Sequence, residues 1–253
     1  SVWMIMDLHQ KELHSLEADA LHPLAPNRNR VTLQQQNGLV DSLFREILPL
    51  EYNFVGPVIH DKLVVGKQNK FGLVRTNRSV VLPLEFDSLL LEGHLVRARE
   101  TTGGKSSWSL YDTVGVRKTQ NSYDRLDPYN GQYFPVVRSG FAGAVDRTGR
   151  ERIACVYDSL LGFDESRSVV KFKGLYGIIS LEDVWLIMPQ PNRLSLLPDN
   201  LYLERQDNLK LVKDSTGQII YFTDNPLTVD QDHFLEKLPD GTEKEINFRG
   251  QLI

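Results

Sequence analysis

The chain has a single cysteine, Cys155, among its 253 residues. One thiol excludes a disulfide within the chain and a metal site built from several cysteines. The residues around Cys155 give no cationic setting that would activate it, so we interpret it as a small buried hydrophobic residue.

The chain also lacks an apolar run approaching the roughly 20 residues that a membrane-spanning helix needs. We therefore expect no membrane insertion of this chain.

Positive charge is present but not concentrated. The sequence has 29 Lys and Arg residues against 33 Asp and Glu residues, which gives a formal net charge of −4. The basic residues are scattered along the chain, whereas a protein that binds nucleic acid needs a basic face for the phosphate backbone. We therefore expect no nucleic-acid partner.

Sequence motifs of catalysis are missing as well. No Gly-x-Ser-x-Gly motif of a nucleophilic serine occurs. The stretch Gly103-Gly104-Lys105-Ser106 resembles the end of a phosphate-binding loop, but the first glycine of that motif would fall at Arg99, and no helical pattern follows. We interpret this stretch as a loop insertion. His9 and His14 would point to opposite faces of a strand, which disfavours a metal pair. We expect no enzyme activity, no cofactor and no metal site.

What the sequence does contain is a repeat of about 34 residues that runs almost from end to end. The units align on Met4, Gly38, Gly72, Ser109, Gly143, Gly177 and Lys210, with spacings of 34, 34, 37, 34, 34 and 33. A fixed period of this size indicates one small structural unit stacked on copies of itself. Because such a unit has no core of its own, we expect a single repeat domain over residues 1–253. Its units start near residues 3, 37, 71, 108, 142, 176 and 209, and a closing segment covers residues 242–253.

Two columns of the repeat keep one chemical character in all units. The first, nearly halfway from one anchor to the next, is Asp or Asn, at Asp19, Asn53, Asp87, Asp124, Asp158, Asn192 and Asn225. The second, two positions further on, is apolar, at Leu21, Val55, Leu89, Leu126, Leu160, Leu194 and Leu227. We interpret the apolar column as core and the Asp/Asn column as turn residues. A ring of metal-binding carboxylates is the alternative, but one carboxylate per unit is too dilute for calcium or magnesium.

Each unit has the pattern of short strands joined by tight turns. In the unit from Phe71, the apolar stretches 71–75 and 80–86 flank a polar turn, and residues 94–98 alternate in polarity. Asp146-Arg147-Thr148-Gly149 and Asp214-Ser215-Thr216-Gly217 occupy equivalent places and predict turns, because Asp bonds to its downstream backbone and Gly allows positive φ. Residues 7–21 have a helix-forming composition, but their register predicts strands. The fold class predicted is all-β.

Aligned in this way, the units resemble those of the WG-containing repeat family. The matching pieces are the aromatic-Gly pairs Phe71-Gly72 and Tyr176-Gly177, the turn segment 145–149, and the pairs Tyr123-Asp124 and Tyr157-Asp158. The resemblance covers roughly residues 2–227, although no unit has a literal Trp-Gly pair. It implies a bacterial protein, often an exported one, without a known reaction. Export to the periplasm or cell surface is thus our expectation for location.

Repeats of antiparallel strands must protect their exposed edges, and two architectures do so. We favour a closed seven-bladed β-propeller, in which residues 242–253 complete a blade together with the strand near residues 2–7. The alternative is an open superhelix of β-hairpins with capped ends. A unit of this length is short for a four-stranded blade, which counts against the ring.

The sequence favours a non-catalytic interaction scaffold that binds a protein partner through a repeat surface. The alternative is a propeller that binds a glycan or another small ligand on one rim of loops. Tyr129 and Tyr133, in the turn-rich loop 127–133, are the candidate contact residues, together with Lys105 in the inserted loop. The aromatic column at Tyr52, Phe86, Tyr123 and Tyr157 would suit stacking on sugars, but a shared column favours packing between units.

Overall fold

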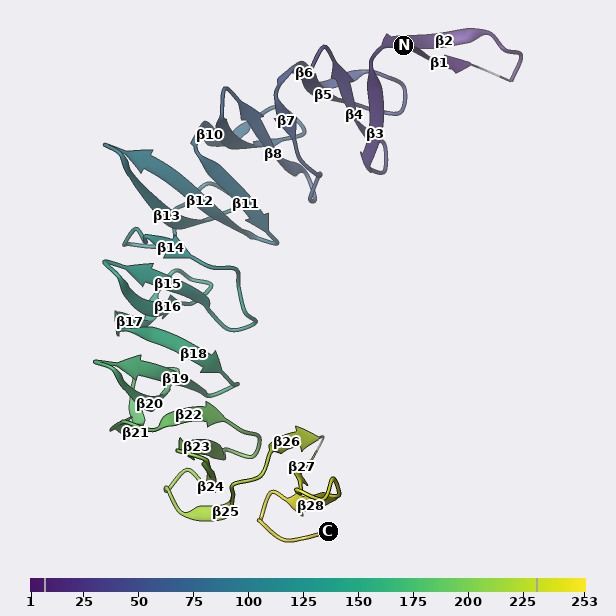
Figure 1. Ribbon diagram of the computed structural model, residues 1–253. Coiled ribbons are helices and arrows are strands. Elements are labelled where there is room, and N and C mark those ends of the chain that lie inside the picture. The colour runs from purple at the N-terminus through teal and green to yellow at the C-terminus, as the bar shows by residue number, and fades with distance from the viewer. Residues whose placement is uncertain (7, 231) are drawn as a thin grey trace. The chain divides into compact units, whose positions relative to one another are not determined.

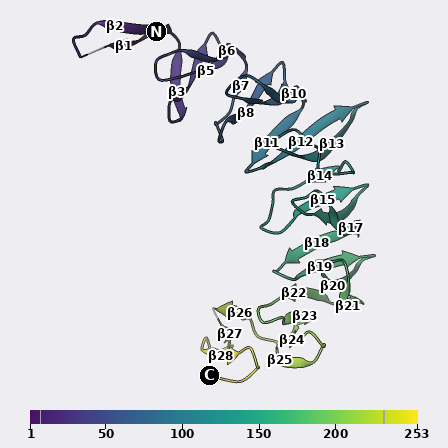
Figure 2. The same ribbon diagram turned by 180° about the vertical axis from the view of Figure 1, so that it is seen from behind.

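The computed structural model consists of β-strands and their connections, and it describes residues 1–6, 8–230 and 232–253. Short antiparallel strands form a series of small sheets along the chain (Figure 1, and from behind in Figure 2). This confirms the all-β repeat predicted from the sequence. Contacts among the residues divide the chain into two compact units, residues 1–126 (unit 1) and residues 127–253 (unit 2). The single domain and the choice between a closed ring and an open stack stay predictions.

Unit 1 begins with a hairpin and continues with sheets whose strands pair in sequence order. The hairpin consists of β1 (Val2–Met6) and β2 (Glu12–Glu17). The next sheet contains β3 (Ala20–Ala25), β4 (Arg28–Leu33), β5 (Gln36–Val40) and β6 (Glu46–Tyr52). It is followed by a sheet of β7 (Phe54–Val55), β8 (Lys62–Lys67), β9 (Lys70–Arg75) and β10 (Val80–Phe86). The last is formed by β11 (Ser88–Glu92), β12 (Leu95–Thr102) and β13 (Lys105–Asp112), and β14 (Arg125–Leu126) ends the unit.

Unit 2 follows the same plan. β15 (Phe134–Arg138), β16 (Phe141–Val145) and β17 (Glu151–Tyr157) pair in that order. The next sheet contains β18 (Ser159–Phe163), β19 (Arg167–Phe172), β20 (Leu175–Ser180) and β21 (Trp185–Gln190). It is followed by β22 (Arg193–Leu196), β23 (Tyr202–Gln206), β24 (Leu209–Lys213) and β25 (Ile219–Thr223). The last sheet has β26 (Leu227–Asp230), β27 (His233–Lys237) and β28 (Glu243–Asn247).

The sheets are offset from the sequence period by about half a unit. The anchor residues Gly38, Gly72 and Gly177 lie in the third strand of their sheets, β5, β9 and β20. The apolar column instead opens the sheets, with Val55 in β7 and Leu194 in β22. One sheet therefore combines the second half of one sequence unit with the first half of the next. The N-terminal segment follows its register and forms β2 and β3, as predicted; position 7 lies outside the described residues.

The anchor is usually glycine because the fourth strand comes very close to it. A Cβ atom at Gly38, Gly72 or Gly143 would lie 2.8, 2.8 or 2.7 Å from a carbonyl oxygen of the fourth strand. In each of these pairs the register shifts around the anchor, as expected for a β-bulge. The pair at Lys210 keeps a continuous register from Lys210–Thr223 to Val212–Tyr221, so a side chain fits there.

Residues of the Asp/Asn column fix the crossing from one sheet to the next. The side-chain oxygens of Asp19, Asn53 and Asp158 accept hydrogen bonds from the backbone N–H groups of Gln34, Gln68 and Gly174, at 2.8, 3.0 and 2.7 Å. Each donor lies in the turn between the second and third strands of the sheet that the column residue precedes. At these three positions the column is structural, as interpreted, but it caps a turn of the following sheet rather than its own local turn. Asp87 instead accepts from Lys70 Nζ, and Asn192 and Asn225 donate to Glu204 and Glu236.

The predicted turns are formed. Asp146 accepts hydrogen bonds from the backbone N–H groups of Thr148 and Arg150, at 2.8 and 3.1 Å, and Asp214 does the same for Thr216 and Gln218, at 2.9 Å each. Gly149 and Gly217 follow with φ of 83° and 89°. A second class of turn lies at Gly103-Gly104, which joins the long strands β12 and β13. The insertion predicted there is therefore a longer hairpin.

The core is distributed as small clusters between neighbouring sheets rather than as one mass. One cluster in unit 2 consists of Val169, Ile178, Leu194 and Tyr202, drawn from β19, β20, β22 and β23. Leu194 is 2% exposed there. In the same apolar column Leu160 is only half-buried, although it packs against the cluster around Ile153 and Tyr157.

Replacing Leu194 with Asp should test the core role of the apolar column. The substitution would bury a carboxylate without a partner, and we expect it to lower the free energy of unfolding by about 3 kcal/mol or more. Leu186→Asp is the control, because Leu186 is 47% exposed on β21 of the adjacent sheet and should change stability by less than about 0.5 kcal/mol. Urea denaturation of both variants measures the difference, and equal midpoints would show that the column is not core.

Replacing Gly143 with Ala should test the close approach at the anchor. The new Cβ would meet the Ile153 carbonyl oxygen at 2.7 Å, and the backbone there must move. We expect a loss of about 2 kcal/mol of stability. Gly162→Ala is the matched control, because Gly162 lies in a strand of the same unit with no atom within 4 Å of its Cβ position. A melting temperature that falls only for Gly143→Ala is the expected result; a similar fall for both would point to backbone flexibility instead.

Candidate functional site

The three contact residues predicted from the sequence lie in two different places. Lys105 opens β13 in unit 1, with a side chain that is 77% exposed and a Nζ atom 3.8 Å from Asp124. Tyr129 and Tyr133 share one loop of unit 2. The ring of Tyr129 lies 5.1 Å from that of Phe134, with the Arg147 guanidinium 5.3 Å from its centre. Lys105 is thus an accessible cation, whereas the ring of Tyr129 is already engaged.

Tyr133 is also packed rather than free. Its ring centre lies 6.4 Å from that of Phe163, on the hairpin of the next sheet. Burial raises the pKa of the Tyr133 hydroxyl above its usual value. The aromatic column behaves in the same way, because Tyr52, Phe86, Tyr123 and Tyr157 are all buried. Packing between sheets therefore accounts for these aromatic residues, as interpreted from their shared column.

The loop that carries both tyrosines does border a groove. The loops between the first and second strands of successive sheets lie along one side of unit 2 (Figure 1). They comprise residues 127–133, 164–166 and 197–201. Two cavities of about 590 and 600 Å³ open between them and share Phe163, Asp164 and Glu165 as lining residues. The Gln132 side chain spans two of the loops by donating from Nε2 to the Glu165 carbonyl oxygen at 2.8 Å. The predicted loop is therefore the wall of a groove, although its tyrosines do not lie open in it.

A buried arginine organises this groove. The guanidinium of Arg167 donates to Asp164 Oδ2 at 2.7 and 2.9 Å, and to the carbonyl oxygens of Asn200, Leu197 and Leu201 at 2.8, 3.2 and 3.2 Å. Burial alone would raise the pKa of Asp164, but the bonds from Ser166 and Arg167 hold it below its usual value. The ion pair is thus a clamp between two loops, and neither partner is free to act on a ligand.

The outer strands of the sheets differ in charge. In unit 1, β6 carries Glu46 and Glu51 around Pro49, and β10 carries Glu85 next to Leu84 and Pro83. Such charges and prolines are common protections of a free sheet edge. In unit 2, β17 carries Glu151 and Arg152, whereas β21 and β25 contain no charged residue. Their exposed large side chains are apolar, at Leu186, Met188, Ile219 and Phe222, with Val184 directly before β21.

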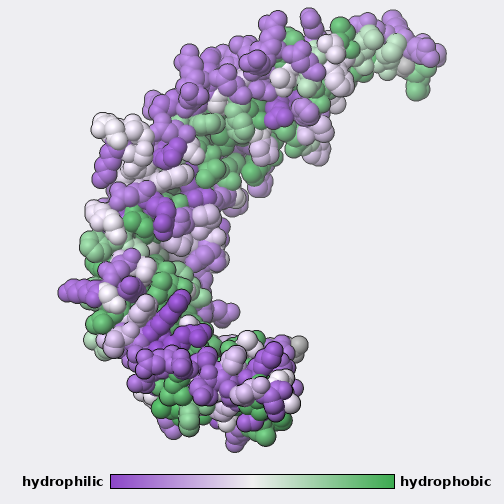
Figure 3. Space-filling model, viewed as in Figure 1, coloured by the Kyte–Doolittle hydropathy of each residue, from purple (hydrophilic) through white to green (hydrophobic). Residues whose placement is uncertain are grey.

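The strand β21 therefore forms a sheet edge without charged side chains. It pairs with β20 through Ile179–Trp185, Ile178–Ile187 and Tyr176–Gln190, and no strand of the described residues pairs with its other side. Hydrophobic side chains reach the surface in this part of the chain (Figure 3). We call Val184, Leu186 and Met188 the β21 patch. The sequence did contain its signal, an alternation of exposed positions without charge, but only the strand order shows that this strand lies at an edge.

A pair of histidines in unit 1, His60 and His94, could have been predicted from the repeat spacing but was not. His60 and His94 occupy one column of the repeat, because each stands at the same distance after its anchor glycine, Gly38 or Gly72. Their rings stack with centres 5.7 Å apart and planes inclined by 28°. Within the described residues no group of three or more His, Cys, Asp or Glu side chains could hold a metal ion. The pair is a contact between equivalent turns of neighbouring sheets.

Cys155 lies in β17 with its thiol half-buried. Burial and a hydrogen bond with Glu151 raise the pKa of the thiol to about 12. A thiol with such a pKa stays protonated at neutral pH and is a poor nucleophile. This agrees with the expectation that the thiol is not activated, although Cys155 is only half-buried rather than buried.

No helix in the described part of the chain is long and apolar enough to cross a membrane.

Comparison with solved structures gives weak likenesses along most of the chain. A crystal structure of a eukaryotic initiation factor has a TM-score of 0.42 at 10% identity, over 93% of this chain and 86% of that one. Hsv2p of Kluyveromyces lactis has a TM-score of 0.35 at 7% identity, over 89% and 91% of the two chains. The AfRom2 CNH domain has a TM-score of 0.34 at 8% identity, over 92% of each. At these scores the likenesses establish no common fold, and the all-β assignment rests on the strands described above.

No curated protein matches the sequence. The family model of the WG containing repeat matches residues 143–176. This segment runs from the anchor glycine of one unit to the residue before the next anchor, and it contains β17, β18 and β19. The other four-stranded sheets repeat its strand order. The resemblance to the WG-containing repeat family read from the sequence is confirmed at residues 143–176.

Proposed function

We propose that this chain is a non-catalytic scaffold that binds a protein partner, and that the partner adds a strand to the free edge of β21. The observation that carries the proposal is the β21 patch on an edge without charge or a neighbouring strand among the described residues. An edge strand presents unpaired N–H and C=O groups to any extended segment that approaches it. The backbone of Val184 is already bonded to Ser180, and Pro189 lacks an N–H group, so the partner strand would pair along residues 185–188.

The energetics favour a strand rather than an apolar contact alone. Val184, Leu186 and Met188 are 57%, 47% and 67% exposed. Covering them would contribute roughly half of the 1.5–3 kcal/mol that full burial of each side chain provides. Association costs at least about 4 kcal/mol in lost translational and rotational freedom. The side chains therefore do no more than offset this cost, and backbone hydrogen bonds must supply the remaining affinity.

The chemistry of the partner follows from the patch. A strand that pairs with β21 places its own alternate residues beside Leu186 and Met188, so these residues should be apolar. Charged residues at the same positions would lose their hydration without an ion-pair partner, because β21 offers none. We expect an extended segment with apolar residues at every second position.

A glycan or small ligand in the groove of unit 2 is the second candidate. The exposed carboxylates of Glu165 and Asp199 and the amide of Asn200 could bond to hydroxyl groups beside the ring of Phe163. The packing of Tyr129 and Tyr133 against their neighbours disfavours this candidate, because it leaves a single aromatic ring in the lining. A saturable rise in melting temperature with an oligosaccharide, lost in Phe163→Ala, would favour the glycan over the protein.

Site-specific photocrosslinking tests the protein partner. We expect p-benzoylphenylalanine at position 186 to give a discrete adduct with one protein in the cells that naturally produce this chain. The adduct should disappear when Val184 and Met188 are both changed to Lys, since two lysines would protect the edge. The same probe at Glu85, on the charged outer strand β10 of unit 1, is the control and should give none. Equal adducts at both positions, or none at position 186, would contradict the proposal.

A further inference from the structure

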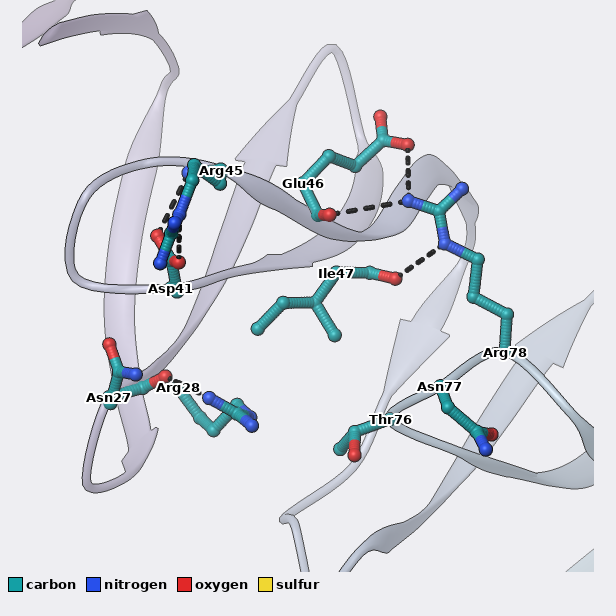
Figure 4. Close-up of a pocket in the computed structure, with 9 residues that line it drawn as sticks. All are labelled: Asn27, Arg28, Asp41, Arg45, Glu46, Ile47, Thr76, Asn77 and Arg78. Carbon is teal, nitrogen blue, oxygen red and sulfur yellow. Dashed lines mark hydrogen bonds and ion pairs between the residues drawn. The ribbon is translucent and has the colours of Figure 1, made fainter.

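Three turns of unit 1 and the strand ends beside them line an open cavity of about 350 Å³ (Figure 4). Asn27 comes from the turn between β3 and β4, and Arg28 is the first residue of β4. The connection between β5 and β6 contributes Asp41 and Arg45. The turn between β9 and β10 adds residues 76–78. Three guanidinium groups and two carboxylates belong to the lining, so it carries one net positive charge in a chain that is negative overall.

Both carboxylates of the cavity are already occupied. Asp41 accepts hydrogen bonds from the backbone N–H groups of Leu43 and Arg45, at 2.8 and 2.9 Å, and from Arg45 Nε at 2.6 Å. Burial would raise the pKa of Asp41, but these bonds lower it. Glu46 accepts from Arg78 at 3.1 Å. The two acids therefore hold Arg45 and Arg78 in place rather than offering acceptors to a ligand.

The amide oxygens near the cavity are occupied as well. Asn27 Oδ1 accepts a hydrogen bond from the backbone N–H of Ser42 at 2.8 Å. Asn77 Oδ1 accepts from the backbone N–H and the hydroxyl of Ser79, at 3.0 and 2.7 Å. An amide whose oxygen is bonded in this way presents its NH₂ group, which only donates. The side chains that remain for a ligand are thus mostly donors.

Arg28 is the cation of this cavity without an acid partner. Its guanidinium donates to the Asn27 carbonyl oxygen at 2.7 Å, and in the described part of the chain it forms no ion pair. The side chain is half-buried among the turns (Figure 4). A guanidinium has five N–H donors in a planar fork, so most of the hydrogen-bonding capacity of Arg28 is unused.

We propose that this cavity binds an oxyanion group, a carboxylate or a phosphate, and that Arg28 is the main residue that binds it. The planar fork of a guanidinium matches both groups and bonds to them through two oxygens. Arg45 and Arg78 add positive charge that is already fixed by Asp41 and Glu46, so little side-chain freedom is lost on binding. The cavity volume lies near the lower end for ligand sites, which suits a small anion or the anionic end of a larger molecule.

The proposal is independent of the partner at β21, because it concerns unit 1 and a different chemistry. Inorganic phosphate and acetate are the probes, each titrated into the full chain while the backbone amide signals of Asn27 and Thr76 are followed by NMR. We expect saturable shifts with a Kd on the order of 1 mM for the preferred anion, equivalent to about −4 kcal/mol. Tighter binding of phosphate would identify a phosphate group as the natural ligand, and tighter binding of acetate a carboxylate.

Substitution of Arg28 decides whether this cavity is the site. Arg28→Ala should weaken binding of the anion by at least about tenfold. The Kd of Arg28→Lys should lie between those of the wild type and Arg28→Ala, because an ammonium lacks the planar fork. Lys105→Ala removes an exposed cation elsewhere in unit 1 and should leave the Kd unchanged. Melting curves of the variants separate loss of the site from loss of the fold. Shifts that fail to saturate with either probe, or that persist in a folded Arg28→Ala variant, would overturn the proposal.

Discussion

The crossing from one sheet to the next depends on a pair of hydrogen bonds at a single junction residue. The backbone N–H of Asp19 bonds to the Thr32 carbonyl oxygen at 2.8 Å, and its carboxylate caps the turn at Gln34. Asn53 and Asp158 repeat both bonds in later sheets. Because these junctions are bound to the sheet that follows, each of the three sheets begins at a defined place. The apolar residue two positions later is thereby directed into the contact with its neighbours, where the core clusters form.

This constraint leaves the other connections free to vary. The loops at residues 127–133, 164–166 and 197–201 join the first two strands of their sheets and differ in length and composition. The inserted hairpin at Gly103-Gly104 likewise lengthens two strands without disturbing the sheet. Function on a repeated scaffold resides in such segments and in solvent-facing positions of outer strands, because the repeat does not fix them. The uncharged edge of β21 and the arginine-lined cavity of unit 1 both belong to this variable part.

Much of the fold could be predicted from the sequence, because period and alternation report burial directly. The anchors, the apolar column and the turns at Asp146 and Asp214 all lie where a chain of equivalent repeated units requires them. The half-unit offset was not readable, since a period has no inherent starting point. The candidate sites were harder to predict from the sequence, because they depend on which side chains contact one another rather than on the residue types. Tyr129 is engaged by Phe134 and Arg147, whereas Arg28 has no acid partner among the described residues, and neither fact is visible in the spacing.

The offset between sheet and sequence period has a consequence for how such a chain can change length. Suppose that one whole period is duplicated or deleted, starting at any residue. The N-terminal part of one sheet is then joined to the matching C-terminal part of an equivalent sheet. The product contains only complete sheets with their junction residues in place, as long as the added or lost segment keeps the period. Genetic recombination within the repeat can therefore alter the number of sheets without precise breakpoints. The longer unit around Gly103 shows that even the period tolerates change where a hairpin points into solvent.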